Sequence, residues 1–328
     1  MLLNKIRNKI LPQNPDNTVK KRNARIDFDN SYPDVPRLDG KRLGAESIPD
    51  MDAYLDNCVE NLLKEHNNPR AQKYLTEIRP YITYEDEPGL IGEMLVSNGY
   101  LDDIFPKLSE EDFQLEIQLI HEINKMGCHV LFLHRMGFLE DDEIKKITPL
   151  LMGYVGRFES VLSNLALILE IGRKGNYQAT DFLIEEFKKP NIYEREITDD
   201  MTELQKELRW NSSRRWAVSN ALLQIKDKSR LDDYIEFTKN ADTRQDCFLI
   251  ADLIGRYKCQ KSYECLLDLL NDTDWHLQGS ALNALRFYYK YDDIEEHVRP
   301  FLDNKHDALR EYARKNMKKI QKYRQKGE

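Results

Sequence analysis

The sequence lacks long apolar runs: no stretch approaches the roughly 18–20 uninterrupted apolar residues that a membrane-spanning helix needs. Its first residues, 1–11, mix charged side chains with apolar ones, so they lack the continuous apolar core of a secretory signal. We therefore expect a cytoplasmic protein with no membrane span.

The cysteines lack a pattern. There are five in 328 residues, and no Cys-x-x-Cys pair occurs among them. An odd, scattered set in a long chain is neither a disulfide framework nor a zinc ribbon. The densest group of possible metal ligands has spacings that match no standard zinc module; it consists of His121, Cys128, His129 and His134. His121 lies in an apolar helical segment and is predicted to be a hydrogen-bonded core histidine.

Catalytic motifs are missing as well. The sequence contains no Gly-rich phosphate loop, no Gly-x-Ser-x-Gly elbow and no His-Glu-x-x-His. Pairs of acids such as Asp141-Asp142 mostly begin predicted helices, where the helix dipole favours negative charge without any catalytic role. We expect no catalytic residue, no cofactor and no metal site, and hence a protein that is not an enzyme.

Strand patterns are also nearly absent, because no segment alternates apolar and polar residues cleanly. Apolar residues recur instead at spacings of three and four from about residue 50 onward, which predicts an all-α fold. Helices are expected at roughly 141–153, 158–172 and 177–189, among others. Ser109 to Asp112 resembles a capping box, with Asp in place of the usual Glu.

Three regions follow from this pattern. Residues 1–48 form an irregular segment with a short amphipathic helix, because five prolines punctuate polar sequence between 12 and 50. Residues 49–157 form an irregular helical N-terminal half. Residues 158–324 form a repeat region, interrupted by an insertion at 190–210.

Internal repetition is the most specific signal in the chain. Three sets of positions recur at steps of 30, 33 and 33: Arg214, Arg244, Leu277 and Arg310; Ala217, Cys247, Ser280 and Ala313; and Ala221, Ala251, Ala284 and Met317. Asp242, Asp274 and Asp307 precede the helices and are predicted to cap them. Each unit of about 32 residues reads as two antiparallel helices, one with small residues four apart, and such pairs must stack to bury both faces.

These residues resemble the HEAT-repeat family, whose pattern is Leu-Leu, then Asp, then Arg-x-x-Ala-x-x-Ala-Leu. The matching positions are Leu266-Leu267, Asp272, Ala281 and Ala284-Leu285, and in a second unit Arg215, Ala221-Leu222 and Ile225. Gln278 stands where the family often has Arg. The resemblance is good over 211–324 and weak over 140–190. It implies a right-handed α-solenoid of stacked helical hairpins and leaves the function open.

Charge is unevenly distributed along the chain. Residues 1–45 carry a net charge of +5, and residues 305–328 carry +6. Because the whole chain has a net charge of −8, residues 46–304 carry −19. Within the repeats, the inner-type helices, which carry the Arg-x-x-Ala pattern, hold ten basic and three acidic residues. The outer-type helices hold three basic and nine acidic residues. One face is therefore expected to be basic and the other acidic.

The resemblance implies that the inner-type helices line a concave face, and we expect a binding surface there. The candidate residues are Arg214, Arg215, Trp216, Arg244, Arg256, Trp275, Arg286 and Tyr289. Exposed aromatic and Arg side chains anchor many protein interfaces. The alternative for the arginines is a ladder of helix-to-helix contacts, and for the aromatic residues a place in the core.

The sequence thus predicts a non-catalytic scaffold, adaptor or inhibitor that binds a protein partner, including an immunity-type inhibitor that masks a basic protein with its acidic body. The alternative is a nucleic-acid-binding protein, or a relative of the HEAT-like DNA glycosylases, that uses the Arg-lined groove. Those glycosylases place an Asp four residues after a Trp, whereas Trp210, Trp216 and Trp275 are followed there by Arg, Asn and Gly.

Overall fold

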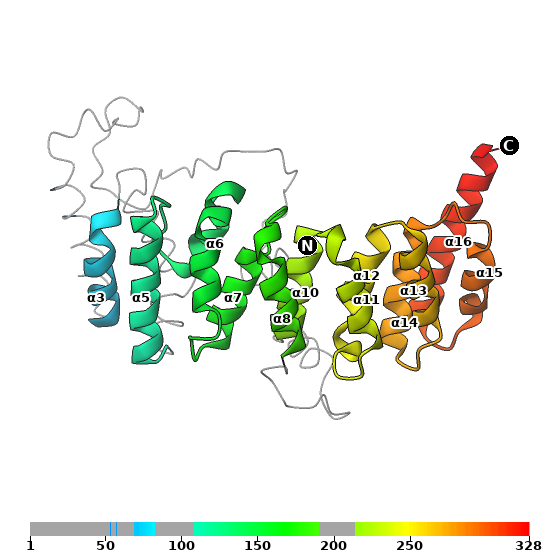
Figure 1. Cartoon of the computed structure of the whole chain (residues 1–328), viewed down its shortest axis with the longest axis horizontal. Coiled ribbons are helices and arrows are strands. Elements are labelled where there is room, and N and C mark those ends of the chain that lie inside the picture. The colour runs from blue at the N-terminus through cyan, green and yellow to red at the C-terminus, as the bar shows by residue number, and fades with distance from the viewer. Residues whose placement is uncertain (1–52, 54–56, 58–68, 83–107, 190–213, 328) are drawn as a thin grey trace, which may run out of the picture. The chain divides into compact units, whose positions relative to one another are not determined.

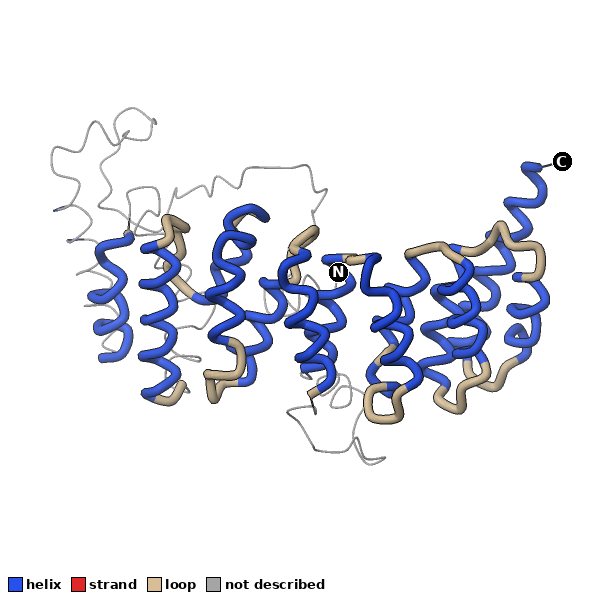
Figure 2. The backbone as a smooth tube through the Cα atoms, in the orientation of Figure 1, coloured by secondary structure: helices blue, strands red, loops and turns tan. Residues whose placement is uncertain are grey.

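The structure is a computed structural model that describes residues 53, 57, 69–82, 108–189 and 214–327. The chain divides into two compact units, residues 1–54 and 55–328, and the helices described below belong to the second unit. The predicted N-terminal segment 1–48 and the insertion at 190–210 lie outside the described residues. Within those residues every regular element is a helix and none is a strand, as Figure 2 shows, so the all-α prediction is confirmed.

The helices before the insertion confirm three of the predicted segments, at 141–153, 158–172 and 177–189. In chain order, with η for 3-10 helices, they are α3 (Pro69–Ile78), η2 (Arg79–Tyr81), α5 (Glu110–Lys125), η6 (Leu133–Phe138), α6 (Asp141–Tyr154), α7 (Val161–Ile171), η7 (Tyr177–Ala179) and α8 (Thr180–Lys188).

The helices after the insertion cover the repeats. They are α10 (Arg214–Ile225), η8 (Lys228–Arg230), α11 (Leu231–Lys239), η9 (Arg244–Asp246), α12 (Phe248–Arg256), α13 (Gln260–Leu270), α14 (Trp275–Ala284), η10 (Leu285–Phe287), α15 (Ile294–Val298), η11 (Arg299–Asp303) and α16 (Asp307–Gly327). The inner-type helices of the sequence correspond to α10, α12, α14 and α16, and the outer-type helices to α11, α13 and α15.

The predicted capping box at the start of α5 is half formed. The Ser109 hydroxyl accepts a hydrogen bond from the backbone N–H of Asp112 at 3.1 Å, as expected of an N-cap. The buried Asp112 carboxylate does not reach back to Ser109. It accepts hydrogen bonds from the backbone N–H groups of Glu159 and Ser160, at 2.7 and 2.6 Å. Asp is one methylene shorter than the Glu that closes a capping box, and here it ties the loop before α7 to α5.

The aspartates that precede the repeat helices differ in role. Asp274 caps α14 as predicted, because its carboxylate accepts the N–H of His276 at 2.8 Å. The prediction is wrong for Asp242, since a 3-10 turn intervenes and α12 begins only at Phe248. Asp307 is itself the first residue of α16 and pairs with Arg310.

Each repeat helix packs against helices close to it in the chain. In the second unit α10 contacts α7, α8 and α12, then α12 contacts α14, and α14 contacts α16. The outer-type helices lie against their neighbours in the same way: α11 contacts α12 and α13, and α13 contacts α14. Figure 1 shows this succession, with helices of consecutive labels adjacent through the repeat region.

Small residues allow the closest of these contacts. A Cβ atom added to Gly172, at the end of α7, would lie 2.4 Å from the Cα atom of Ala221 in α10. A Cβ atom on Gly255 in α12 would lie 2.8 Å from the Cβ atom of Ala284 in α14. Both alanines belong to the recurring set identified in the sequence. The predicted reason for that set, a close backbone approach between neighbouring helices, is therefore confirmed at these two contacts.

Candidate functional site

Arg215 is a buried contact between helices. The side chain is 5% exposed and leaves α10 toward the end of α8, where its Nε donates to the Phe187 carbonyl at 3.0 Å. Its Nη1 donates to the Asp242 carbonyl and, at 2.7 Å, to the Asp246 carboxylate. Arg215 was among the candidate binding residues, but its donors are engaged inside the protein. The alternative role, as one step of a ladder, describes it better.

The same contact recurs in the next three repeats. Each time, one side chain donates to a backbone carbonyl within one residue of the end of the preceding helical segment. The donors and carbonyls are Arg215 and Phe187, Arg244 and Thr238, Gln278 and Leu270, and Arg310 and Asn304. Arg244 also pairs with Asp272, as Arg215 pairs with Asp246. We call Arg215, Arg244, Gln278 and Arg310 the ladder.

The ladder corrects the sequence register. The repeat was aligned on Arg214 and Leu277, whereas the equivalent contacts come from the next residue in each case, Arg215 and Gln278. Arg214 instead lies 3.5 Å from the buried carboxylate of Glu186 and is mostly covered. Consecutive residues on a helix point about 100° apart, so a slip of one residue exchanges a ladder side chain for its neighbour.

The candidate tryptophans lie in different environments. Trp216 is 8% exposed and belongs to the core around α10. Trp275, at the start of α14, is 36% exposed and stacks on His306 with ring centroids 5.1 Å apart and planes 10° apart. Trp275 is therefore accessible to a partner, whereas Trp216 is buried.

Arg256 and Arg286 are brought together, and they share one carboxylate. Asp252 of α12 contacts the Arg256 guanidinium at 2.8 Å and the Arg286 guanidinium at 2.7 Å. Both guanidinium groups also lie near the ring of Phe287, at 5.7 and 4.3 Å from its centroid. Cations within about 6 Å of an aromatic centroid are attracted by the ring quadrupole. The shared Asp252 and the ring together hold both arginines in place.

Three lysines, in the turns after α12 and η10 and on α16, extend this group. The Nζ of Lys258 is 5.9 Å from the centre of the Phe287 ring. Lys319 lies 4.6 Å from the Tyr289 ring and donates to the Arg286 carbonyl at 2.8 Å. Lys290 lies 5.5 Å from the Tyr323 ring, which meets Tyr289 edge to face. We name these eight residues the cation–aromatic cluster: Arg256, Lys258, Arg286, Phe287, Tyr289, Lys290, Lys319 and Tyr323.

Positive charge in this cluster is poorly compensated. Asp252 is the one carboxylate that its five cations contact within the described part of the chain, and it serves two arginines. Lys258, Lys290 and Lys319 form no ion pair with any described residue. Partial burial, together with the positive charges of Arg286 and Lys258, lowers the pKa of Lys319. Binding of an anion reduces the mutual repulsion of like charges held together in this way.

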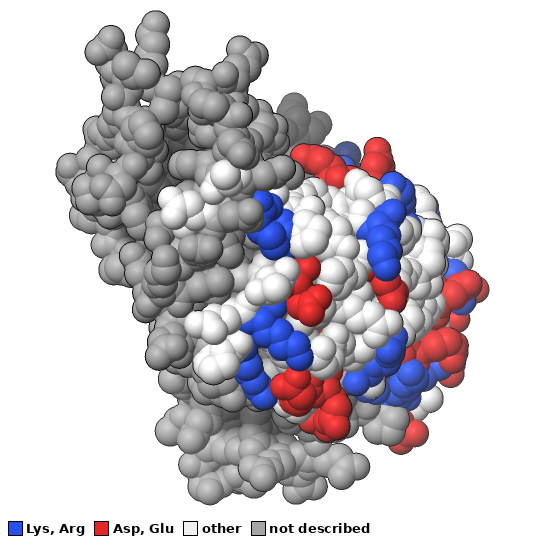
Figure 3. Space-filling model, turned by 90° about the vertical axis from the view of Figure 1, so that its left-hand side faces the viewer, with Lys and Arg blue, Asp and Glu red and all other residues white. Residues whose placement is uncertain are grey.

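The end of the described helices at α3 has the opposite character. Figure 3 shows basic and acidic side chains interspersed on that face, without a patch of a single sign. Two basic residues there are paired: Arg70 and Lys73 of α3 lie 3.7 and 3.4 Å from Glu110 of α5. Opposite charges at this end satisfy one another, so they offer little net attraction to a charged ligand.

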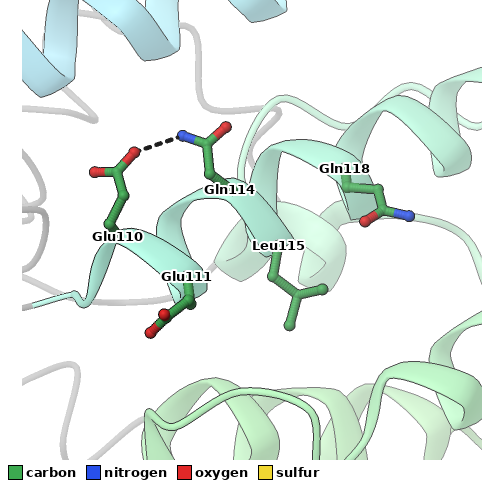
Figure 4. Close-up of a pocket in the computed structure, with 5 residues that line it drawn as sticks. All are labelled: Glu110, Glu111, Gln114, Leu115 and Gln118. Atoms are coloured by element: carbon green, nitrogen blue, oxygen red, sulfur yellow. Dashed lines mark hydrogen bonds between the residues drawn. The ribbon is translucent and has the colours of Figure 1, made fainter.

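A shallow hollow on α5 does not bring together functional groups from different elements. It has a volume of about 340 Å³ and is lined by Glu110, Glu111, Gln114, Leu115 and Gln118. All five side chains come from one helix, and Gln114 is already bonded to Glu110 at 2.9 Å, as Figure 4 shows. One exposed helical face with a satisfied amide does not resemble the convergent polar groups of a small-molecule site.

The side chain of His134, one of the four possible metal ligands in the sequence, lies outside the described residues. Among the described residues, no three potential ligands of the kinds His, Cys, Asp and Glu gather. His121 is hydrogen-bonded as predicted, since its Nδ1 lies 2.6 Å from the Tyr81 hydroxyl. It is partly exposed rather than part of the core, and it faces Glu77 at 3.6 Å.

Sequence reasoning missed the lysines of the cluster. A lysine follows the inner-type helices at regular steps of 32: Lys226, Lys258 and Lys290. The first two adopt a left-handed backbone, with φ of 59° and 54°, one and two residues after the ends of α10 and α12. A cation beyond a helix C-terminus is favoured by the helix dipole, so this recurrence has a local cause. This periodicity was the signal available for finding Lys258 and Lys290.

The chain matches no model of a known protein family and no curated protein sequence. Among the described helices, none combines the length and the apolar character needed to cross a membrane.

Proposed function

We propose that this protein is a non-catalytic, cytoplasmic scaffold, adaptor or inhibitor that binds another protein. Its repeats would form a HEAT-like, right-handed α-solenoid, and the partner would bind on the exposed side of α12, α14 and α16. The observation that carries this proposal is the ladder, because one structural contact recurs in four consecutive units near the starts of the inner-type segments, while the cation–aromatic cluster lies exposed toward their ends.

The ladder supports a HEAT-like stack for a physical reason. Each ladder side chain satisfies a carbonyl near the end of one helix and leaves from near the start of a later one. For Arg244, Gln278 and Arg310 this contact spans the turn within a hairpin. The small residues Gly172 and Gly255 then bring successive hairpins close together. Repeats that contact mainly their neighbours expose a long surface, and solenoid proteins use such surfaces for binding.

The surface chemistry supports a protein partner. Arg and Tyr are enriched among the residues that dominate binding energy in protein interfaces. Arg256, Arg286 and Tyr289, three of the predicted binding residues, meet in one cluster. Four cysteines of the described residues are free thiols, which agrees with a reducing compartment.

Nucleic-acid binding is the second candidate, and the cluster is the observation that favours it. Cations beside aromatic rings are typical of single-stranded nucleic-acid sites. Against it stands the net charge of −19 on residues 46–304, which repels a polyanion as it approaches. We therefore rank the protein partner first.

Affinity purification of the tagged full chain from its native cells, with and without nuclease, tests the proposal. Mass spectrometry should find one or a few proteins that are captured near stoichiometry and remain after nuclease treatment. Captured material that is nuclease-sensitive and lacks such a protein would contradict the proposal and favour the second candidate. Repeating the capture at high salt measures the electrostatic share of the interaction.

A further inference from the structure

The cations of the cluster are held ready for a ligand that the described residues do not supply. Lys258, Lys290 and Lys319 have no carboxylate partner within the described part of the chain, yet each lies over an aromatic ring. A long lysine side chain loses conformational entropy when it is fixed in an interface. Rings that already restrict these side chains reduce that loss, so the arrangement favours anion capture.

The geometry of the rings distinguishes two kinds of anion. Successive bases of a single strand stack on open, roughly parallel aromatic faces. Here Tyr289 and Tyr323 meet at an interplanar angle of 78°, and Lys319 covers Tyr289 at 4.6 Å. Phe287 has three cations within 5.9 Å of its centre. The ring faces are occupied by cations, which leaves the charges, rather than the rings, as the main recognition elements.

The extent of the positive charge also limits the ligand. Five cations and one carboxylate lie on α12, η10, the turns after these two helices, and α16. The outer-type helices of the same repeats are acidic. A long polyanion would extend beyond the cluster and be repelled by the acidic helices, whereas a short run of carboxylates would contact mainly the cluster. Tyr323, which is 41% exposed, adds an apolar surface at the edge of the charges.

We propose that the cation–aromatic cluster binds an acidic segment of a protein partner. Carboxylates of that segment pair with Lys258, Lys290 and Lys319, and an aromatic or aliphatic side chain next to them packs against Tyr323. This inference rests on the proposed function and gives it a location and a ligand chemistry.

The test uses the purified full chain and three fluorescent probes, read by fluorescence anisotropy. The first probe is a short peptide in which Glu and Asp alternate with Phe. The second replaces every acid by its amide, and the third is a single-stranded oligothymidylate of similar charge. Two variants of equal charge change are compared: the cluster variant Lys290→Glu/Lys319→Glu and the control variant Lys174→Glu/Lys239→Glu. Lys174 and Lys239 are exposed and contact none of the eight cluster residues.

The acidic peptide should bind to the wild type and the control variant with affinities within about twofold of each other. The cluster variant should bind it at least about tenfold more weakly, a difference of about 1.4 kcal/mol. The amide peptide should not bind. Circular dichroism of both variants should match the wild type, which separates lost recognition from lost folding.

Three results would overturn the inference: no binding of the acidic peptide to the wild type, equal binding to both variants, or tighter binding of oligothymidylate than of the peptide. The first two leave the proposed function standing if affinity purification still yields a stoichiometric protein. The third, together with nuclease-sensitive capture, overturns both.

Discussion

The ladder and the cation–aromatic cluster belong to the same repeat region and use positive side chains for opposite purposes. Arg215 of the ladder is 5% exposed and has a carboxylate and two carbonyl oxygens as partners. Lys319 of the cluster is exposed, has one carbonyl partner and is surrounded by other cations. Position on the helix therefore decides whether a cation stabilises the fold or is available to a ligand.

This difference makes a general point about repeats with many charges. A buried cation must be fully satisfied, because leaving one member of a buried pair without its partner is strongly destabilising. An exposed cation carries no such requirement, and exposed ion pairs contribute little to stability. Changes in the ladder should therefore affect folding, and changes in the cluster should affect binding alone.

The largest expected effect comes from breaking the ladder at its most buried position. Arg215→Met removes the cation that pairs with the buried Asp246 carboxylate at 2.7 Å and also removes the donor to Phe187. The free energy of unfolding should fall by about 3–5 kcal/mol, measured by urea unfolding followed by circular dichroism. The double variant Arg215→Met/Asp246→Leu should recover part of that loss. A loss below about 1 kcal/mol in the single variant would show that the ladder does not hold the fold together.

A smaller effect is expected where helices approach most closely. Gly172→Ala places a Cβ atom 2.4 Å from Ala221, so the contact between α7 and α10 must open. Overpacking of this kind typically lowers stability by about 1–3 kcal/mol. Gly153→Ala in α6 is the matched control, because nothing lies within 4 Å of the added atom. Its thermal midpoint should be unchanged or slightly raised, since alanine is the better helix former.

The two glycine variants separate packing from helix propensity. If both substitutions lowered the melting temperature equally, a general intolerance of substitution would explain the result better than the contact between α7 and α10.

The sequence predicted more of the fold than of the candidate site. The apolar spacing predicted α6, α7 and α8, and the recurring alanines predicted close helix contacts, because both are local patterns with a fixed period. The ladder and the cluster depend on which side of a helix a residue faces. Arg214 and Arg215 are adjacent and chemically identical, and the internal repeat was aligned on Arg214. The contacts with Phe187 and Asp246 identify Arg215 as the ladder residue.

The lysines show a different reason for a missed site. Lys258 and Lys290 lie in turns after helices, outside the segments on which charges were counted. Lys319 was counted, but in the highly basic α16, where its sequence gives no sign of its contact with Tyr289. Residues from three elements form the cluster, and their proximity follows from the packing of α12, α14 and α16.

The cluster variant provides the next prediction. Lys290→Glu/Lys319→Glu should change the free energy of unfolding by less than about 0.5 kcal/mol, because exposed charges contribute little to stability. Partner binding should weaken at least about tenfold over the same substitution. A destabilisation comparable to that of Arg215→Met would contradict the view that the ladder stabilises the fold while the cluster serves binding.

The smallest expected effect concerns pH. The pKa of Lys319 is lowered by burial and by Arg286 and Lys258, so the folded state disfavours its charged form. Below its folded pKa the charge opposes folding, and this penalty disappears as the pH rises through that pKa toward 10.5, the ordinary value. Lys319→Gln should therefore be slightly more stable than the wild type at neutral pH, and the difference should shrink at alkaline pH.

Chemical denaturation of the wild type and Lys319→Gln at a series of pH values checks this sign. A difference that grows with pH would mean that the Lys319 ammonium is favourably paired in the folded protein, contrary to the description of the cluster.

The most direct test of the account is quantitative capture from native cells with three baits: the wild type, the cluster variant Lys290→Glu/Lys319→Glu and the control variant Lys174→Glu/Lys239→Glu. We expect the wild type and the control variant to enrich the same protein partner, and the cluster variant to lose it while remaining folded. Full retention of every partner by the cluster variant would contradict the central claim that this cluster is the binding surface.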